Sequence, residues 1–148
     1  MDLFVLVQKL DKFGTPLQAF TVPNQSPMAH DLTDHGATVL RYKGSDGRLR
    51  VSARHLDEVL TTEDVPAHTF DRVEKLSPGE VVKIDIELVP LGLVFYPGEQ
   101  LRFIVSSTNL LGTLMPAIDE YVGANSGQHV IHTGGEHASY LQLPVQAD

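Results

Sequence analysis

The 148-residue sequence contains neither cysteine nor tryptophan. Without cysteine it can form no disulfide and no thiolate metal site, and this composition fits a cytoplasmic protein. The lack of tryptophan, with only four tyrosines, weakens a carbohydrate-binding role that would use an exposed aromatic platform. No apolar run approaches the roughly 18 residues of a membrane helix, and the first ten residues lack a signal peptide's basic region and cleavage site.

Basic residues are also few, with 11 Lys and Arg against 19 Asp and Glu. The formal net charge is therefore −8, and the isoelectric point is about 5.2. A surface of this sign repels phosphate backbones, so we expect no nucleic-acid partner. Because the sequence lacks an apolar run of membrane-helix length, we expect no membrane partner either. The length fits one domain, and a hydrophobic fraction of 42% is enough for one core.

Residues 76–107 hold the clearest structural pattern. Apolar and polar residues alternate over 82–88 and in part over 101–105, which predicts two half-buried strands. A turn with the sequence Pro-Gly-Glu precedes each strand, at 77–80 and at 96–99. We interpret the pair as the centre of an antiparallel β-sandwich.

Further short strands separated by Gly and Pro turns are predicted along the rest of the chain. This organisation is typical of an all-β sandwich or barrel. The expected strands cover 3–7, 38–42, 48–54, 130–131 and 140–145, with a hairpin continuing at 19–22, a turn at 43–47, a loop over 23–36 and a short helix near 116–122.

No complete catalytic site is predicted. Ser106 and Ser107 end a strand and lack the strained Gly-x-Ser-x-Gly elbow of serine hydrolases. His132 and His137 could approach each other across a Gly-Gly turn and, with Glu136, hold zinc. The favoured alternative is that they are surface histidines that cap backbone groups, so we expect no metal and no cofactor.

Two further clusters could contact a ligand or a partner, and the residues predicted for a pocket or interface are His68, Phe70, Asp71, His132 and His137. His68, Phe70 and Asp71 lie in an extended stretch and could face a partner domain, although local structural roles are the simpler interpretation. A second cluster is a row of arginines on the 48–54 strand, which could grip a carboxylate or an acidic surface. The row consists of Arg48, Arg50 and Arg54. More often such a row pairs with acidic residues on a neighbouring strand, which here could be Asp85 and Glu87.

Eight short motifs, in order, resemble the C-terminal domain of X-Pro dipeptidyl-peptidase-like serine hydrolases, a family that includes cocaine esterase and α-amino acid ester hydrolases. No single motif is specific, but the ordered series is, and it runs from residue 2 to about 145. The motifs are Asp2-Leu3-Phe4-Val5, Gly44-Ser45-Asp46-Gly47, Leu49-Arg50-Val51-Ser52 with Arg54, His68-Thr69-Phe70-Asp71-Arg72-Val73, Leu76-Ser77-Pro78-Gly79-Glu80, Pro97-Gly98-Glu99-Gln100-Leu101-Arg102, Val105-Ser106-Ser107 and His132-Thr133-Gly134-Gly135-Glu136-His137-Ala138-Ser139.

The resemblance implies a jelly-roll β-sandwich similar to galactose-binding-like domains. It also implies that the Ser-Asp-His triad lies in a separate α/β-hydrolase domain upstream, on which this domain packs, lining the substrate pocket and aiding oligomerisation. We therefore expect a non-catalytic accessory domain over 1–148 that lacks its first strands, with a hydrolase catalytic domain or a second copy as partner. The alternative is an independent small-ligand or carbohydrate-binding module; the accessory role predicts an uncovered apolar face.

Overall fold

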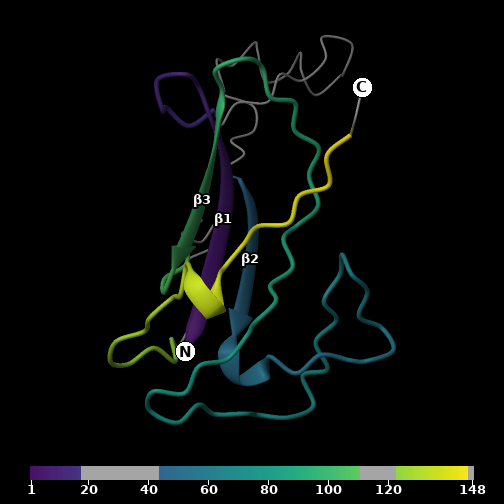
Figure 1. Ribbon diagram of the computed structural model, residues 1–148, viewed down its shortest axis with the longest axis vertical. Coiled ribbons are helices and arrows are strands. Elements are labelled where there is room, and N and C mark those ends of the chain that lie inside the picture. The colour runs from purple at the N-terminus through teal and green to yellow at the C-terminus, as the bar shows by residue number, and fades with distance from the viewer. Residues whose placement is uncertain (18–43, 111–122, 147–148) are drawn as a thin grey trace, which may run out of the picture.

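The computed structural model describes residues 1–17, 44–110 and 123–146 (Figure 1). Its regular part is one three-stranded antiparallel sheet in the order β2-β1-β3. The strands are β1 (Asp2–Leu10), β2 (Ser45–Arg50) and β3 (Gln100–Ser106), and two single 3₁₀ turns are η1 (Val51–Ala53) and η2 (Gly135–His137). No described helix is long and apolar enough to cross a membrane.

β1 is the centre of both the sheet and the core. Its run of five apolar residues, Leu3–Val7, is buried on both faces of the sheet, whereas an alternating strand buries only one. The prediction of a strand at 3–7 is confirmed, and the strand continues to Leu10. The buried apolar residues of the described chain are Leu3, Phe4, Val5, Leu6, Val7, Leu10, Leu49 and Val51.

β2 starts earlier and ends earlier than the sequence pattern predicted. Residues 45–47 were predicted as part of a turn, but they pair with β1, and the strand gives way to η1 at Val51. The cause is a tertiary contact, because the 86–89 segment packs against the start of β2. The Val89 amide donates to the Asp46 carbonyl at 2.9 Å, and a Cβ at Gly47 would overlap the Glu87 carbonyl oxygen. Glycine is therefore needed for this close approach.

Both Pro-Gly-Glu turns are confirmed, and they have the same construction. In each, the glutamate amide donates to the carbonyl three residues earlier, at 3.1 Å for Glu80 to Ser77 and 3.0 Å for Glu99 to Tyr96. Each glutamate carboxylate then accepts the amide of that same earlier residue, at 2.8 Å and 2.6 Å. The turn glycines have φ of 81° and 88°, the left-handed region that glycine occupies without strain.

The strand predicted at 82–88 is extended chain outside the sheet, so this prediction is wrong. Its alternation is nevertheless expressed in part in burial, because the apolar positions are partly buried while Lys83 and Glu87 are exposed; Asp85 is partly buried as well. Alternation of apolar and polar residues therefore indicates which side chains are buried, but it does not indicate that the segment is hydrogen-bonded to a neighbouring strand. The strands predicted at 130–131 and 140–145 likewise lie outside the described sheet.

Four predicted elements lie outside the described residues. They are the hairpin at 19–22, the loop at 23–36, the strand at 38–42 and the helix near 116–122.

Candidate functional site

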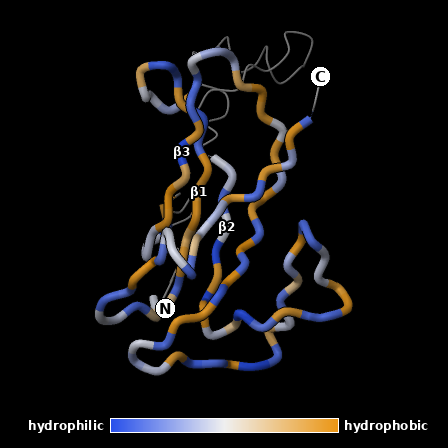
Figure 2. The backbone as a smooth tube through the Cα atoms, viewed as in Figure 1, coloured by the Kyte–Doolittle hydropathy of each residue, from blue (hydrophilic) through white to orange (hydrophobic). Residues whose placement is uncertain are grey.

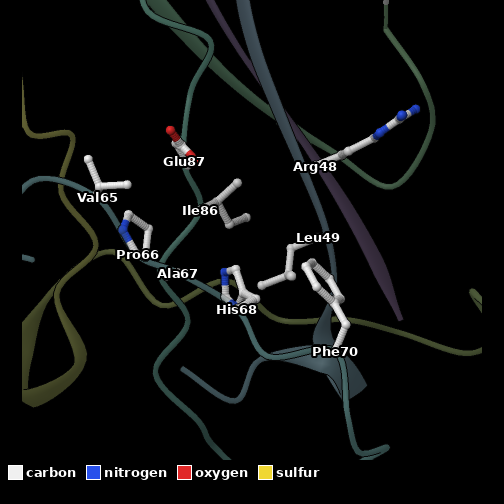
Figure 3. A pocket seen from close by; sticks show the side chains of 9 residues that line it. All are labelled: Arg48, Leu49, Val65, Pro66, Ala67, His68, Phe70, Ile86 and Glu87. Atoms are coloured by element: carbon white, nitrogen blue, oxygen red, sulfur yellow. The ribbon is translucent and has the colours of Figure 1, made fainter. Parts of the chain in front are cut away.

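A pocket of about 300 Å³ lies between β2 and two chain segments, 65–70 and 86–87 (Figure 3). Most of its wall is aliphatic or aromatic. The charged side chains lie at its edge, and the Arg48 guanidinium points away from the other lining side chains (Figure 3). The pocket is lined by Arg48, Leu49, Val65, Pro66, Ala67, His68, Phe70, Ile86 and Glu87.

The 66–69 wall is held in place by main-chain hydrogen bonds to the 55–57 segment. The Asp57 amide donates to the Ala67 carbonyl at 2.7 Å, and the Thr69 amide donates to the His55 carbonyl at 3.1 Å. These bonds flank a bridge centred on His68, so the histidine backbone is fixed on both sides. The wall therefore has a defined shape although it belongs to no long strand.

His68 joins the 66–69 wall to the segment opposite. Its Nε2 lies 3.0 Å from the Asp85 carbonyl oxygen, and because a carbonyl only accepts, Nε2 donates. In the neutral ring the lone pair is then on Nδ1. That nitrogen is buried and has no hydrogen-bond partner among the described residues. An unpaired buried acceptor costs about 1–3 kcal/mol, so this atom is unusual.

Phe70, also a pocket residue, has a strained backbone. Its φ is 53°, a conformation that bulky side chains adopt at a cost of roughly 1–2 kcal/mol. The ring is 71% exposed, so burial in the free domain does little to offset that cost. Its centroid lies 5.8 Å from that of the His68 ring, at 51° to it.

Asp71, the third residue of the predicted cluster, does not line the pocket. It accepts hydrogen bonds from the Thr69 hydroxyl and, at 3.2 Å, from Nε of Arg72. The bond from Arg72, followed by that from Thr69, lowers the pKa of Asp71 to about 2. The structure thus brings His68 and Phe70 together and gives Asp71 a local role at the surface.

His132 and His137 do approach each other, across η2. Their ring centroids are 5.4 Å apart at 71°, and the Ser139 hydroxyl donates to the His132 carbonyl at 2.6 Å. Both rings are exposed. No group of three or more potential metal ligands exists among the described residues, so Glu136 does not complete a set with them.

The predicted arginine row divides among three environments. Arg50 pairs with Asp2 at 2.7 Å, and Arg54 pairs with Glu74 at 3.3 Å while also donating to its carbonyl at 2.6 Å. The prediction that these two arginines pair with acids of the 82–88 segment is therefore wrong. Arg48 lies at the edge of the pocket. Because Arg54 follows η1, it no longer shares a strand face with the other two.

A second candidate surface is one face of the edge strand β3. Leu101, Phe103 and Val105 lie opposite Lys9, Val7 and Val5 of β1, so all six side chains share one side of the sheet. The two β1 valines are buried, but the three β3 side chains are 38%, 40% and 39% exposed. Figure 2 shows β3 as one of several apolar stretches. An open apolar row beside a buried one is typical of a surface that another domain covers.

Sequence reasoning missed the aliphatic walls of the pocket. Leu49, Pro66 and Ile86 come from three segments that are far apart in the chain, and each reads locally as an ordinary core or turn residue. Of the residues predicted for a pocket or interface, His68 and Phe70 line it. These two residues were candidates because they lie close together in an extended stretch of the sequence. The unpaired nitrogen of His68 and the strained backbone of Phe70 cannot be seen in the sequence.

Together these features define a β-rich domain with an open sheet face and a small apolar pocket. The chain matches, over residues 1–142, the family described as the X-Pro dipeptidyl-peptidase C-terminal non-catalytic domain, and it belongs to this family. The non-catalytic C-terminal domain of X-Pro dipeptidyl-peptidase-like hydrolases that the sequence motifs predicted is thereby confirmed. Comparison with curated proteins gives no match.

Two crystal structures of a CocE/NonD family hydrolase from Staphylococcus aureus are similar to this chain. Each is 32% identical in sequence to this chain, the match covers 79% of this chain, and the TM-score is 0.60. The chain spans 19% of the solved hydrolase chain. The likeness therefore concerns one domain of a much larger protein.

Proposed function

We propose that this domain is an accessory domain that packs on the α/β-hydrolase catalytic domain of an acyl esterase or dipeptidyl-peptidase through the open face of β3. The exposed row Leu101, Phe103 and Val105 carries the proposal. Membership in a family of non-catalytic hydrolase domains supports a hydrolase catalytic domain as the partner. A hydrolase that contains a similar region as one fifth of its chain supports the same arrangement.

The size of the open row suits the centre of such an interface. Three side chains that are each about 40% exposed leave on the order of 200 Å² of apolar surface, and burying it contributes about 5 kcal/mol. A stable interface covers roughly 800 Å² on each partner, so the row accounts for its core and not its whole area. Further exposed apolar residues near the start of β3, Val94, Phe95 and Tyr96, extend the surface.

The proposed complete fold is a jelly-roll β-sandwich of the galactose-binding-like kind. The family supports it, and so does the path of the 82–89 segment, which runs in extended form beside β2 and bonds to it at Val89 (Figure 1). In such a sandwich the described sheet is one part, and the extended segments supply the second layer.

The proposal is tested by reconstituting a hydrolase from two separately produced pieces. The Staphylococcus aureus hydrolase, with the region similar to this chain removed, is expressed with the chain supplied separately. We expect a one-to-one complex by light scattering and recovered turnover of a chromogenic ester such as p-nitrophenyl acetate. Substituting Phe103→Gln should weaken the complex at least tenfold, because a central aromatic contact contributes about 2 kcal/mol or more.

The matched control is Val59→Gln. Val59 is 89% exposed. It belongs to the segment after η1, and Figure 1 shows that segment on the far side of β2 from β3. This variant should assemble like the unmodified chain. Equal weakening by both substitutions, or failure of the unmodified chain to assemble with a folded hydrolase fragment, would reject the proposed interface.

We further propose that copies of the domain associate through the same face when no catalytic domain is present. An edge strand with an open apolar face is prone to such pairing. Light scattering over a dilution series should give a dimer that dissociates on dilution and is lost in Phe103→Gln. A monomer at every concentration would reject self-association and leave the packing proposal standing.

A further inference from the structure

The extended 82–88 segment has two main-chain edges, and one of them is already engaged. In an extended chain the N–H and C=O of one residue point to the same edge, and successive residues alternate between the two edges. The Asp85 carbonyl accepts a hydrogen bond from His68, and the Val89 amide donates to the Asp46 carbonyl at 2.9 Å. Odd-numbered residues therefore point towards β2 and His68, and even-numbered residues point the other way.

The opposite edge of the segment is unpaired. In the part of the chain that the structure describes, no hydrogen bond reaches the main-chain N–H or C=O groups on this edge. A row of alternating donors and acceptors matches the edge of another strand, which supplies the same groups at the same spacing. The four residues that form the row are Val82, Ile84, Ile86 and Leu88.

The side chains restrict which strand can pair here. The apolar side chains of the even-numbered residues are partly buried, whereas Lys83 and Glu87 are exposed. Glu87 forms no ion pair with a described residue, and Lys83 lies 3.0 Å from Asp85 of its own segment. Because opposite charges on facing positions stabilise a pair of strands, the incoming strand should place an acid opposite Lys83 and a base opposite Glu87.

The segment Val-Lys-Ile-Asp-Ile-Glu-Leu meets these requirements itself. When two copies are aligned antiparallel with Asp85 at the centre, apolar residues face apolar residues and each lysine faces a glutamate. The apolar pairs are also those whose main-chain groups face the partner, so side chains and backbone favour the same register. The facing pairs are Val82 with Leu88, Lys83 with Glu87, and Ile84 with Ile86.

We propose that two copies of this chain pair antiparallel through the open edges of their 82–88 segments, with a two-fold axis at Asp85. The two Asp85 carboxylates face each other, and the neighbouring Lys83 of each copy offsets part of that repulsion. This contact lies outside β3 and goes beyond the packing and association proposed for that strand. Two short edge strands pair weakly, so the contact must be trapped to be measured.

A disulfide trap measures the pairing, because the chain contains no cysteine of its own. Asp85→Cys is made in the Phe103→Gln chain and oxidised in glutathione buffer at high protein concentration. In the proposed register the two positions form a non-hydrogen-bonded pair with Cα atoms about 4.5 Å apart, within reach of a disulfide. We expect a disulfide-linked dimer on a non-reducing gel.

The matched control is Glu87→Cys in the same background. Position 87 faces position 83 of the other copy, so the two cysteines would lie roughly 13 Å apart along the strands. Asp85→Cys should cross-link at least tenfold faster than this control. Val59→Cys, at a position that is 89% exposed and outside the segment, should be as slow as Glu87→Cys.

A charge exchange tests the register. Adding Glu87→Lys to the Asp85→Cys chain places lysine opposite Lys83 and should slow cross-linking several-fold. Adding Lys83→Glu as well recreates the opposite charges in the reverse order. This triple change should restore the cross-linking rate.

Hydrogen exchange provides a second measurement that needs no cysteine. In the Phe103→Gln chain, raising the protein concentration should slow exchange of the amides at 82, 84, 86 and 88 more than that of the amides at 83, 85 and 87. The difference follows from the direction of each amide. This measurement decides the proposal even where Asp85→Cys fails to fold.

The proposal is overturned if Asp85→Cys cross-links no faster than Glu87→Cys, or if the charge exchange fails to restore the rate. It is also overturned if the even-numbered amides gain protection in the two-piece hydrolase complex of the unmodified chain and not at high concentration of the chain alone. That result would give the edge to a strand of the hydrolase. Because the self-pairing measurements all use Phe103→Gln, failure of the β3 interface would not change them.

Discussion

Gly47→Ala tests the close contact between β2 and the 86–89 segment. A Cβ at this position overlaps the Glu87 carbonyl oxygen and lies 3.0 Å from Cγ2 of Ile86 and 3.1 Å from Cγ2 of Val5. The first obstacle is a backbone atom, so no side-chain rotation removes it. The 86–89 segment must therefore move away from β2.

The displacement breaks identifiable interactions. The 2.9 Å hydrogen bond from the Val89 amide to Asp46 is lost, as is the bond from the Ser45 hydroxyl to the Val89 carbonyl. Two such bonds contribute about 2 kcal/mol, and forcing a methyl group into a packed site costs roughly 1–3 kcal/mol. Part of the strain is relieved by the movement itself, so we expect a loss of about 3 kcal/mol in the free energy of unfolding.

The assay is urea and thermal unfolding followed by far-ultraviolet circular dichroism. A loss of about 3 kcal/mol corresponds to a decrease in Tm of about 6–12 °C for a domain of this size. Gly92→Ala is the control, because a Cβ there meets no atom within 4 Å and no left-handed φ is imposed. If Gly47→Ala unfolds at the same temperature as Gly92→Ala, the 86–89 segment does not pack on β2 as described.

Three further predictions concern charge and the core. Asp2→Asn should lower the free energy of unfolding by about 2 kcal/mol in urea titrations. The reason is that the Asp2 carboxylate accepts hydrogen bonds from Arg50 at 2.7 Å and from the Ala124 amide at 2.9 Å. An unchanged urea midpoint would contradict this prediction. Hydrogen bonds lower the pKa of Asp71 to about 2, chiefly through Arg72, and that of Glu99 below its usual range, chiefly through Lys9. As the pH falls, the unfolded state therefore binds protons before the folded state does, so these carboxylates stabilise the fold above about pH 4.5 and the urea midpoint should fall towards pH 2. Asp71→Asn should make the urea midpoint depend less steeply on pH. A midpoint independent of pH would refute this coupling of protonation to folding. Val5→Ala, in the fully packed centre of β1, should cost about 2–3 kcal/mol, whereas truncating exposed Val59 should change stability by less than about 0.5 kcal/mol in the same assay.

The strand at 3–7 was predicted because its signal is local, although the sequence pattern placed the centre of the fold at 76–107 and the structure places it on this strand. Five consecutive apolar residues at 3–7 exceed what a half-buried strand needs, and they form the strand that is buried on both faces. The Pro-Gly-Glu turns were predictable because proline and glycine fix the turn dihedrals within four residues. The ordered motifs identified the family by their sequence order, without reference to packing.

The remaining differences arise from contacts between distant segments. The start of β2 contains Ser, Asp and Gly, which locally favour a turn, but pairing with β1 and contact with residues 86–89 extend it instead. The 82–88 segment has strand periodicity without a ladder. In the pocket, His68 and Phe70 were recognisable as candidates, while the three aliphatic walls and the unpaired Nδ1 depend on chain segments meeting in space.

The central claim is that the open face of β3 contacts a hydrolase catalytic domain. Its most direct test places the photo-cross-linking residue p-benzoylphenylalanine at position 103 or at position 59 in the reconstituted two-piece hydrolase. The account predicts a cross-link from position 103 to the catalytic domain and none from position 59. A complex that forms but cross-links from 59, or from neither position, would contradict the account.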